Sequence, residues 1–487
     1  MATAELVGKN QFKSLGLDSF SASKVIQKLL ILAAVGGFAY FFYIKGDGSF
    51  DREGMVVLGI AFAALTIIDS VYGFVGVVIA IGVSPDSVLY NNVRLEDYMV
   101  PPLFVILVIK KFSSPKEVIG EEVMKNVKIY LALALFSTIK GILMETVWVP
   151  TMAMNFYLKY VEYFALMWMT MIGLKKKEDF LTVIIASFFV CGAVGYLAYT
   201  GRQDILEAKS AYAIVRASGP QGETPNVLGG YYLIHIMLAF ALVFAAKNYI
   251  YKVILMGFLV ALAVPLLYTY SRTSFSSVVV GLLVTCLFID LRYMVLIGLL
   301  VFCHQLFLPQ LGQAVVVDDD NKFVDRYSTI FEIFGDDKSK PSSWTARLMG
   351  WYIFFMRTWA SDPVFGRGVG SIGLGIDSSF VQKFVESGLV GVFSFLMILV
   401  RLGRIGLEVA RNSEDRLLRG IAVGYMGLLV GMSVHAVGVT SFSTIRTAEP
   451  FFLFSGMMVA VYYYYKREKA RKEENAKEKE TIKFNAF

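Results

Sequence analysis

The apolar residues of this chain fall in runs long enough to cross a lipid bilayer, and this feature limits its fold more than any other. A helix needs about 20 apolar residues to cross the hydrocarbon core. The 487 residues are 56% hydrophobic and only 17% charged, whereas charged residues make up about a quarter of a typical soluble domain. The sequence therefore predicts an all-α polytopic membrane protein.

About 14 runs qualify as candidate spans by length and apolarity, and we expect about 12–14 transmembrane helices. The second and third runs are short, so they form either two helices or one broken, re-entrant segment. The candidate spans cover residues 25–44, 54–68, 70–83, 98–112, 127–146, 150–173, 180–200, 226–246, 250–269, 274–289, 292–308, 379–401, 417–440 and 449–465.

Lysine and arginine gather in alternate connections between these runs, which sets the expected orientation. The positive-inside rule places both termini in the cytoplasm, residues 1–24 at one end and the charged tail 466–487 at the other. A bundle over 25–308 and C-terminal spans over 379–465 then flank a long outer loop, 309–378. In a Gram-negative cell this loop would face the periplasm, and the protein would then lie in the bacterial inner membrane.

The positive charges lie beside the spans, as this orientation requires. The net charge of +7 is therefore no sign of nucleic-acid binding. The first residues are polar and the first apolar run begins near Val25, so we expect no cleavable signal peptide.

The long outer loop contains a predicted helix in "PSSWTARLMGWYIFFMRTWASDP", which Asp362-Pro363 should end. Aromatic and aliphatic residues recur at helical spacing and form one apolar face, with Arg347 on its flank. The helix either lies in the outer membrane interface or packs against the bundle. Both alternatives place Arg347 at the boundary between water and lipid.

Two further motifs lie in or beside this loop. The cluster Asp318-Asp319-Asp320 is either a solvated acidic loop or a cation site, but it lacks the glycine and closing glutamate of a calcium loop. Residues 368–373 match the GxGxxG fingerprint of dinucleotide-binding proteins. That fingerprint requires a preceding strand and a following helix. Here a helix precedes it, so we predict a tight glycine-rich turn rather than a nucleotide site.

The cysteines and histidines show no metal-ligand spacing. Cys191, Cys286 and Cys303 lie inside apolar runs and are expected to be small buried side chains. The three histidines are expected to be core residues by default. His435 is the most interesting of them, because it lies towards the segment that carries Arg446.

Arginines gather where the outer ends of the spans are expected. Arg216, Arg272 and Arg446 come from separate segments, and Glu449 follows Arg446 within one turn. Each arginine alone is typical of an anchor whose charged end reaches the interface. Together they predict phosphate binding, because arginine is permanently charged and binds phosphate oxygens in bidentate fashion. A polyprenyl diphosphate would hold its diphosphate at this depth.

Four stretches in this order resemble the O-antigen ligase and O-antigen polymerase superfamily of membrane glycosyltransferases, over about residues 216–400. They are "ETPNVLGGYY", "YSRTSFSSVVVGLLV", "WTARLMGWYIFFMRTWASDPVFGRGVGS" and "DSSFVQKFVESGLVGVFSFLMIL". The resemblance implies a GT-C-like membrane fold. It also implies a donor glycan on undecaprenyl diphosphate and an acceptor that is a glycan or lipid A–core. No metal ion, other cofactor or nucleotide sugar is implied.

Carried over by position, the resemblance implies that Arg216, Arg272, Arg347 and Arg446 bind the diphosphate. Ligases of the superfamily have a histidine as the presumed base where this chain has Asp377. We therefore expect Asp377 either to take the acceptor proton or to pair with Arg347 or cap the next span. Residues with a supporting role would be Asn226, Ser271, Ser378, His435 and Glu449.

The replacement of histidine by Asp377 favours an O-antigen-type polysaccharide polymerase. The first alternative is an O-antigen ligase that transfers the glycan to lipid A–core. A peptidoglycan-synthesising membrane glycosyltransferase is a further alternative. A lipid-linked glycan flippase or transporter belongs to another class, which would place charges deep in the bundle and would show internal repeats.

Overall fold

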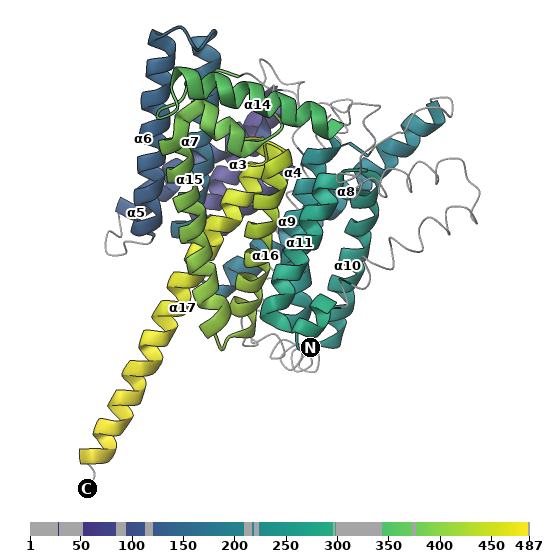
Figure 1. Cartoon of the computed structure of the whole chain (residues 1–487). Coiled ribbons are helices and arrows are strands. Elements are labelled where there is room, and N and C mark those ends of the chain that lie inside the picture. The colour runs from purple at the N-terminus through teal and green to yellow at the C-terminus, as the bar shows by residue number, and fades with distance from the viewer. Residues whose placement is uncertain are drawn as a thin grey trace.

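The computed structural model describes residues 28, 52–83, 94–112, 120–208, 217–218, 224–295, 298, 343–372 and 376–485. Throughout this part of the chain the regular structure is helical, and it contains no strand. The helices run side by side in one bundle (Figure 1). This confirms the predicted all-α class.

Thirteen helices have described bounds. Most coincide with predicted spans, but α15 and α17 continue well past the predicted ends at residues 401 and 465. The runs 54–68 and 70–83 form two separate helices, with Asp69 between them. The helices are α3 (Arg52–Ile68), α4 (Ser70–Val83), α5 (Leu95–Phe112), α6 (Glu121–Leu143), α7 (Pro150–Gly173), α8 (Lys177–Ala208), α9 (Pro225–Ala245), α10 (Tyr249–Tyr268), α11 (Arg272–Ile289), α14 (Ser343–Ser361), α15 (Ser379–Asn412), α16 (Arg416–Gly438) and α17 (Ile445–Asn485).

Within the described residues, 7 helices are long and apolar enough to cross a membrane: α6, α8, α9, α10, α11, α15 and α16. They are what a multi-pass membrane protein requires. Most of the expected runs 25–44 and 292–308 lies outside the described residues. The total of about 12–14 spans therefore stays a prediction, which follows from the length of the apolar runs.

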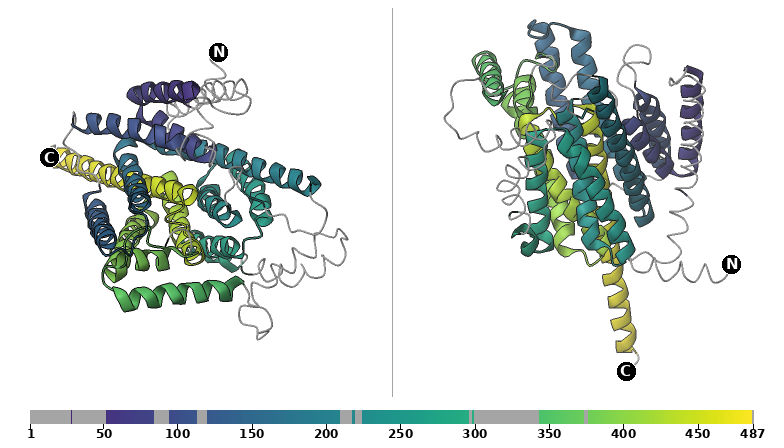
Figure 2. Two further views of the ribbon diagram at one scale, coloured as in Figure 1. Left: turned by 90° about the horizontal axis from the view of Figure 1, so that it is seen from above. Right: turned by 90° about the vertical axis from the view of Figure 1, so that its right-hand side faces the viewer.

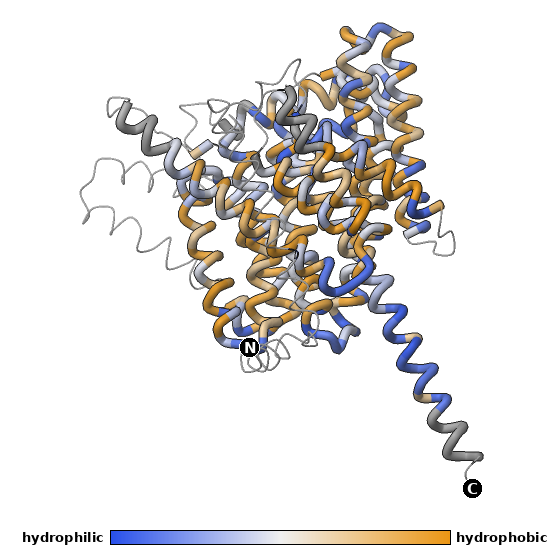
Figure 3. The backbone as a smooth tube through the Cα atoms, turned by 180° about the vertical axis from the view of Figure 1, so that it is seen from behind, coloured by the Kyte–Doolittle hydropathy of each residue, from blue (hydrophilic) through white to orange (hydrophobic). Residues whose placement is uncertain are grey.

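α9 is the centre of the bundle. It contacts α8, α10, α11, α16 and α17, and it is apolar and buried on nearly all sides, as expected for a helix with no polar face. α10 is equally apolar but mostly exposed, as a helix at the lipid-facing edge would be. Apolar residues dominate the bundle, whereas the end of α17 beyond it is hydrophilic (Figure 3).

α14 runs across the helices of the bundle rather than along them, beside α15 (Figure 2). The Phe355 ring stacks on Phe384 of α15, with centroids 4.7 Å apart, and Trp351 joins the same contact. Tyr352 and Trp359 remain largely exposed. The predicted apolar face is thus divided between packing on the bundle and an open surface. α14 ends at Ser361, as its sequence predicts.

α15 is interrupted at Gly388, where the backbone leaves the helical conformation with φ 64° and ψ −165°. The loop after α14 fills the interruption. Arg367 N–H donates to the Val385 carbonyl at 2.7 Å, and Gly368 N–H donates to the Glu386 carbonyl at 2.9 Å. At the break these carbonyls lose the N–H donors that a continuous helix would provide, and N–H groups of the loop take their place.

The other side of the break is paired in the same way. Leu389 N–H donates to the Pro363 carbonyl at 2.9 Å, and Val390 N–H donates to the Val364 carbonyl at 3.3 Å. Non-helical backbone is tolerated inside a membrane protein only where protein or a water-filled cavity satisfies it. The loop and α15 therefore form one structural unit.

This pairing explains the glycine-rich stretch. Gly366, Gly368 and Gly370 all have positive φ, which glycine adopts without strain. A Cβ on Gly366 would lie 2.5 Å from the backbone nitrogen of Gly388. The stretch lies between two helices, so the strand that a dinucleotide site needs is missing here. Its glycines allow the loop to seat against the broken helix.

Candidate functional site

A cavity of about 500 Å³ lies where several inter-helix connections meet at the end of the bundle predicted to face outward. Its volume lies within the range of small-molecule sites. Apolar side chains, among them Phe156 and Ile376, form part of the wall. The polar lining consists of Arg94, Thr224, Asn226, Asp377, Gln382, Glu386, Thr440, Ser443, Thr444 and Arg446. Three of the residues expected from the sequence, Asn226, Asp377 and Arg446, meet here.

Arg446 lies in the first turn of α17 and is 1% exposed. Its Nη1 donates to the Gly82 carbonyl in the last turn of α4 at 2.7 Å. The guanidinium carbon lies 5.9 Å from the centroid of the Tyr231 ring, a cation–π distance. Protein contacts thus hold a permanent positive charge at the cavity wall.

Arg94 brings a second positive charge to the cavity and directly precedes α5. Its side chain is 18% exposed, and Nη1 lies 3.7 Å from Glu96 Oε1. Arg94 is not among the arginines expected from the sequence to bind phosphate. It satisfies the criterion that selected the other arginines, because it immediately precedes an apolar run on the side predicted to face outward.

Glu386 is the most firmly held carboxylate of the cavity and is 2% exposed. Its Oε2 accepts a hydrogen bond from the Tyr160 hydroxyl at 2.8 Å. Its Oε1 accepts one from Gln382 Nε2 at 3.0 Å. α7 and α15 therefore fix both oxygens of the group.

Lys383 supplies the positive charge beside this carboxylate and is itself only 1% exposed. Its Nζ lies 3.8 Å from Glu386 Oε2 and donates to Ser443 Oγ at 3.2 Å. It also lies 3.4 Å from the centroid of the Tyr160 ring. A buried carboxylate is costly unless it is paired and hydrogen-bonded, and these contacts meet both requirements.

Asp377 lies at the rim of the cavity, and its side chain is 60% exposed. Its Oδ2 is 3.2 Å from Arg347 Nε of α14. Ser378, rather than Asp377, caps α15, because Ser378 Oγ accepts from Val381 N–H at 3.5 Å. The expected pair between Asp377 and Arg347 is present, and the base role of Asp377 stays a prediction.

His435 and Ser271 belong to a buried polar network beside the cavity. His435 Nε2 lies 3.0 Å from Ser274 Oγ, and Nδ1 lies 2.7 Å from Ser441 Oγ. Ser271 Oγ lies 2.7 Å from Ser274 Oγ, and Ser274 Oγ donates to the Asn226 carbonyl at 3.2 Å. With both ring nitrogens bonded to protein, His435 joins α16 to α11.

Of the four expected diphosphate ligands, only Arg446 belongs to the described lining of the cavity. Arg347 is not part of that lining, although it pairs with Asp377 at the rim. Arg272 is the first residue of α11, at the same end of the bundle, but the lining does not include its side chain. Arg216 lies outside the described residues, as does the cluster of residues 318–320. Their predicted roles are therefore untested by the geometry.

Glu449 lies behind the cavity, one turn after Arg446, and is fully buried. Neither of its carboxylate oxygens has a hydrogen-bond partner among the described residues. Glu162 and Asp97 lie close enough to interact with it electrostatically, and so does Lys159. Lys159 Nζ is 2.5 Å from Asp97 Oδ1 and 2.8 Å from Glu162 Oε2.

Lys140 of α6 and the pair of Lys159 and Glu162 of α7 belong to two separate groups of charges. Lys140 of α6 pairs with Asp362 and donates to the Gly366 carbonyl at 2.7 Å. It therefore holds the loop that fills the break in α15. Lys159 and Glu162 of α7 belong instead to the group around Glu449.

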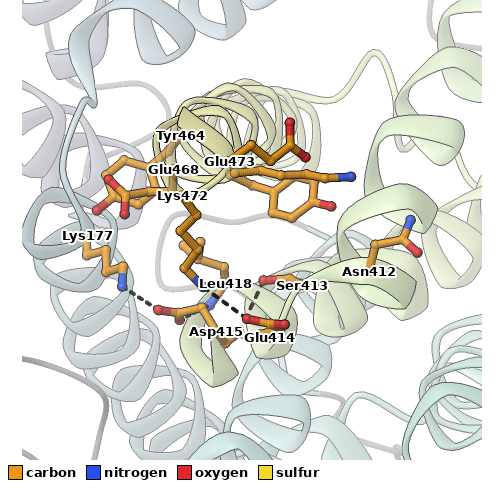
Figure 4. A pocket seen from close by; sticks show the side chains of 12 residues that line it. Lys177, Asn412, Ser413, Glu414, Asp415, Leu418, Tyr464, Glu468, Lys472 and Glu473 are labelled. Carbon is orange, nitrogen blue, oxygen red and sulfur yellow. Dashed lines mark hydrogen bonds and ion pairs between the residues drawn. The ribbon is translucent and has the colours of Figure 1, made fainter. Parts of the chain in front are cut away.

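A second cavity, of about 770 Å³, lies at the opposite end between the charged tail and the turn after α15 (Figure 4). Two ion pairs lie in its wall: Lys177 with Asp415, and Lys472 with Glu414. The Lys472 ammonium lowers the pKa of the exposed Glu414 carboxyl. None of the residues expected from the sequence to form a site lies here. We interpret this cavity as a crevice beside the tail.

Sequence reasoning missed Glu386, Lys383 and Arg94. For the first two a signal was present, because both lie inside the predicted span 379–401. An ionisable residue within a membrane span is expensive and is usually functional. The resemblance had included Glu386 only as part of a helix motif.

No protein-family model matches the chain, and no curated protein matches its sequence. The resemblance to the O-antigen superfamily therefore rests on the four stretches alone.

Proposed function

We propose that this protein is a membrane glycosyltransferase whose donor is a glycan on a polyprenyl diphosphate, bound at the outward-facing end of the bundle. The cavity between the helix ends carries this proposal. It joins two arginines, Arg94 and Arg446, to two carboxylates, Asp377 and Glu386. Arginines suit a diphosphate, and a carboxylate suits removal of the acceptor proton.

The size of the cavity suits binding of only one part of the donor. About 500 Å³ accommodates a diphosphate and the sugars next to it, but not a polyprenyl chain. The chain would stay in lipid beside the exposed apolar helices, and the rest of the glycan would lie outside. α14 exposes Tyr352, Phe355 and Trp359 at the same end of the bundle. Such residues favour the membrane interface.

Within this class we propose an O-antigen-type polysaccharide polymerase, with an O-antigen ligase as the alternative. The test uses bacterial hosts that lack either the polymerase or the ligase and express this protein. A restored ladder of repeats on a lipopolysaccharide gel in the polymerase-deficient host supports the polymerase. If glycan attachment to lipid A–core is restored, and only in the ligase-deficient host, the protein is a ligase rather than a polymerase. If neither host changes, both assignments are contradicted.

The resemblance also implies chemistry without a metal ion. We expect EDTA to leave the rate of undecaprenyl diphosphate release unchanged, because arginines would neutralise the leaving diphosphate. The measurement compares purified protein with and without EDTA, followed by addition of Mg²⁺. A loss of rate that Mg²⁺ restores contradicts the metal-free mechanism.

One observation favours a second candidate function, a lipid-linked glycan flippase or transporter. Glu449 is fully buried beside Glu162 and Lys159, and buried ionisable groups of this kind occur in proton pathways. A transport assay in proteoliposomes distinguishes the two functions. Movement of a lipid-linked glycan across the bilayer without release of undecaprenyl diphosphate would show that the protein is a transporter and not a glycosyltransferase.

A further inference from the structure

We propose that Glu386 is the general base of the reaction and that Tyr160, Gln382 and Lys383 position it. This inference rests on the proposed function. The acceptor hydroxyl oxygen forms a bond to the anomeric carbon of the donor. The bond between that carbon and the diphosphate oxygen breaks, and its electron pair leaves with the polyprenyl diphosphate. The hydroxyl proton passes to the Glu386 carboxylate.

The carboxylate has room to accept this proton. A general base must lie within hydrogen-bond reach of the hydroxyl that it deprotonates, and Glu386 lines the cavity. Tyr160 donates to Oε2 and Gln382 donates to Oε1. Each carboxylate oxygen has two lone-pair sites, so each retains an acceptor position after these bonds. The two donors thus fix the carboxylate and leave it able to receive an acceptor hydroxyl.

Lys383 allows a negative charge to persist in this buried place. Its Nζ is 3.8 Å from Glu386 Oε2, close enough for attraction but longer than a direct hydrogen bond. Ser443 and the face of Tyr160 hold the ammonium instead. The lysine therefore supplies the opposite charge without occupying the lone pairs that the acceptor needs.

The broken helix fixes the same residue from the backbone side. The Glu386 carbonyl accepts hydrogen bonds from Gly368 N–H at 2.9 Å and from Ser137 Oγ at 2.5 Å. Glu386 of α15 is thus held by two other segments of the chain, namely α6 and the loop that follows α14. A catalytic group must be held within about 0.5 Å of its productive position, and such support provides this.

Asp377 is less suited to the same task. Its side chain is 60% exposed and is paired with Arg347, so water and a guanidinium compete for its lone pairs. No comparable network among the described residues holds it. Its place at the rim fits the entry of the substrate better than the chemical step.

The experiment uses the full-length protein and lipid-linked oligosaccharides extracted from the membranes of its own host. Release of undecaprenyl diphosphate reports turnover, and binding of added undecaprenyl diphosphate reports the donor site. For Glu386→Gln we expect turnover to fall by about 10²–10⁴-fold, the usual contribution of a general base, with binding within twofold of the unmodified protein. Glu408→Gln makes the same change at the far end of α15 and should keep full turnover.

Two further variants separate a base from a structural residue. Formate should restore part of the turnover of Glu386→Ala, because it can accept the proton in the space that the side chain vacates. Tyr160→Phe removes one hydrogen bond to the carboxylate. We expect it to lower kcat about tenfold with KM unchanged, provided that Tyr160 only positions the base. This variant also tests the inference if Glu386→Gln fails to fold.

The outcomes are distinct. Turnover of Glu386→Gln within threefold of the unmodified protein overturns this inference and leaves the proposed function intact. A loss of 10²-fold or more in Asp377→Asn, with an active Glu386→Gln, assigns the base to Asp377. An unchanged kcat in Tyr160→Phe contradicts the proposal that Tyr160 positions the base. An unmodified protein that neither binds nor releases undecaprenyl diphosphate overturns this inference and the proposed function together.

Discussion

Replacing Gly388 by alanine is expected to remove nearly all folded protein. Gly388 has φ 64° and ψ −165°, a conformation that is essentially restricted to glycine and costs other residues about 1–3 kcal/mol. A Cβ would also lie 2.2 Å from the Val364 carbonyl oxygen. Relief of that contact requires separation of the loop from the broken helix, which leaves buried backbone groups without partners. Each such group costs several kcal/mol in an apolar environment.

The combined cost approaches the total stability of a typical protein, about 5–15 kcal/mol. The measurement is the amount of monodisperse protein after detergent extraction, together with its melting temperature. Gly350→Ala is the matched control. Gly350 lies in α14, and a Cβ there would meet nothing within 4 Å. We expect the control to be stabilised by about 0.5–1 kcal/mol. A Gly388→Ala protein that melts like the unmodified protein contradicts the role of the break.

Arg446→Gln is expected to weaken the binding of undecaprenyl diphosphate by about 100-fold. A hydrogen bond to a charged group contributes about 1.5–3 kcal/mol, and two bonds from one guanidinium give at least about 3 kcal/mol, or a factor near 100. Glutamine keeps a donor but loses the charge. The measurement is equilibrium binding of undecaprenyl diphosphate to purified protein in nanodiscs.

Arg404→Gln provides the control for a change in net charge, because Arg404 is an exposed residue near the opposite end of α15. It should bind the diphosphate like the unmodified protein. Arg446 also bonds to the Gly82 carbonyl, so the variant must first be shown to be folded. Arg94→Gln gives a second measurement at a more exposed position. Unchanged binding in both cavity variants would exclude the cavity as the diphosphate site.

Much of the fold could be predicted from the sequence, because hydrophobic runs report directly on burial in lipid or protein. The run 150–173 coincides with α7, and 70–83 coincides with α4. The helix of the outer loop was also expected and ends at its Asp-Pro pair. The break at Gly388 could not be predicted. It depends on pairing between backbone groups about 20 residues apart, and hydropathy carries no information about such pairing.

The site was less predictable, for a physical reason. Position relative to a span end pointed to four arginines, and of these Arg446 lines the cavity in the described part of the chain. The same rule does not say which face of a helix a side chain occupies, so Arg272 was expected in a cavity whose described lining does not include it. The run 379–401 that contains Glu386 is apolar enough to predict a span, and this pattern does not reveal the role of a single carboxylate within it. Its partner Tyr160 comes from α7, and Ser443, which holds the neighbouring Lys383, comes from the segment before α17. Both are far away in the sequence.

The pairing at Gly388 has a consequence for biogenesis. Residues 363–368 supply the groups that complete α15, and they precede 385–390 in the chain. During synthesis they leave the ribosome first, so we expect them to be available before α15 is complete. The two half-helices can therefore find their partners as soon as they enter the bilayer. We expect a tag or insertion within 363–368 to disrupt this pairing and to leave backbone groups of α15 without partners.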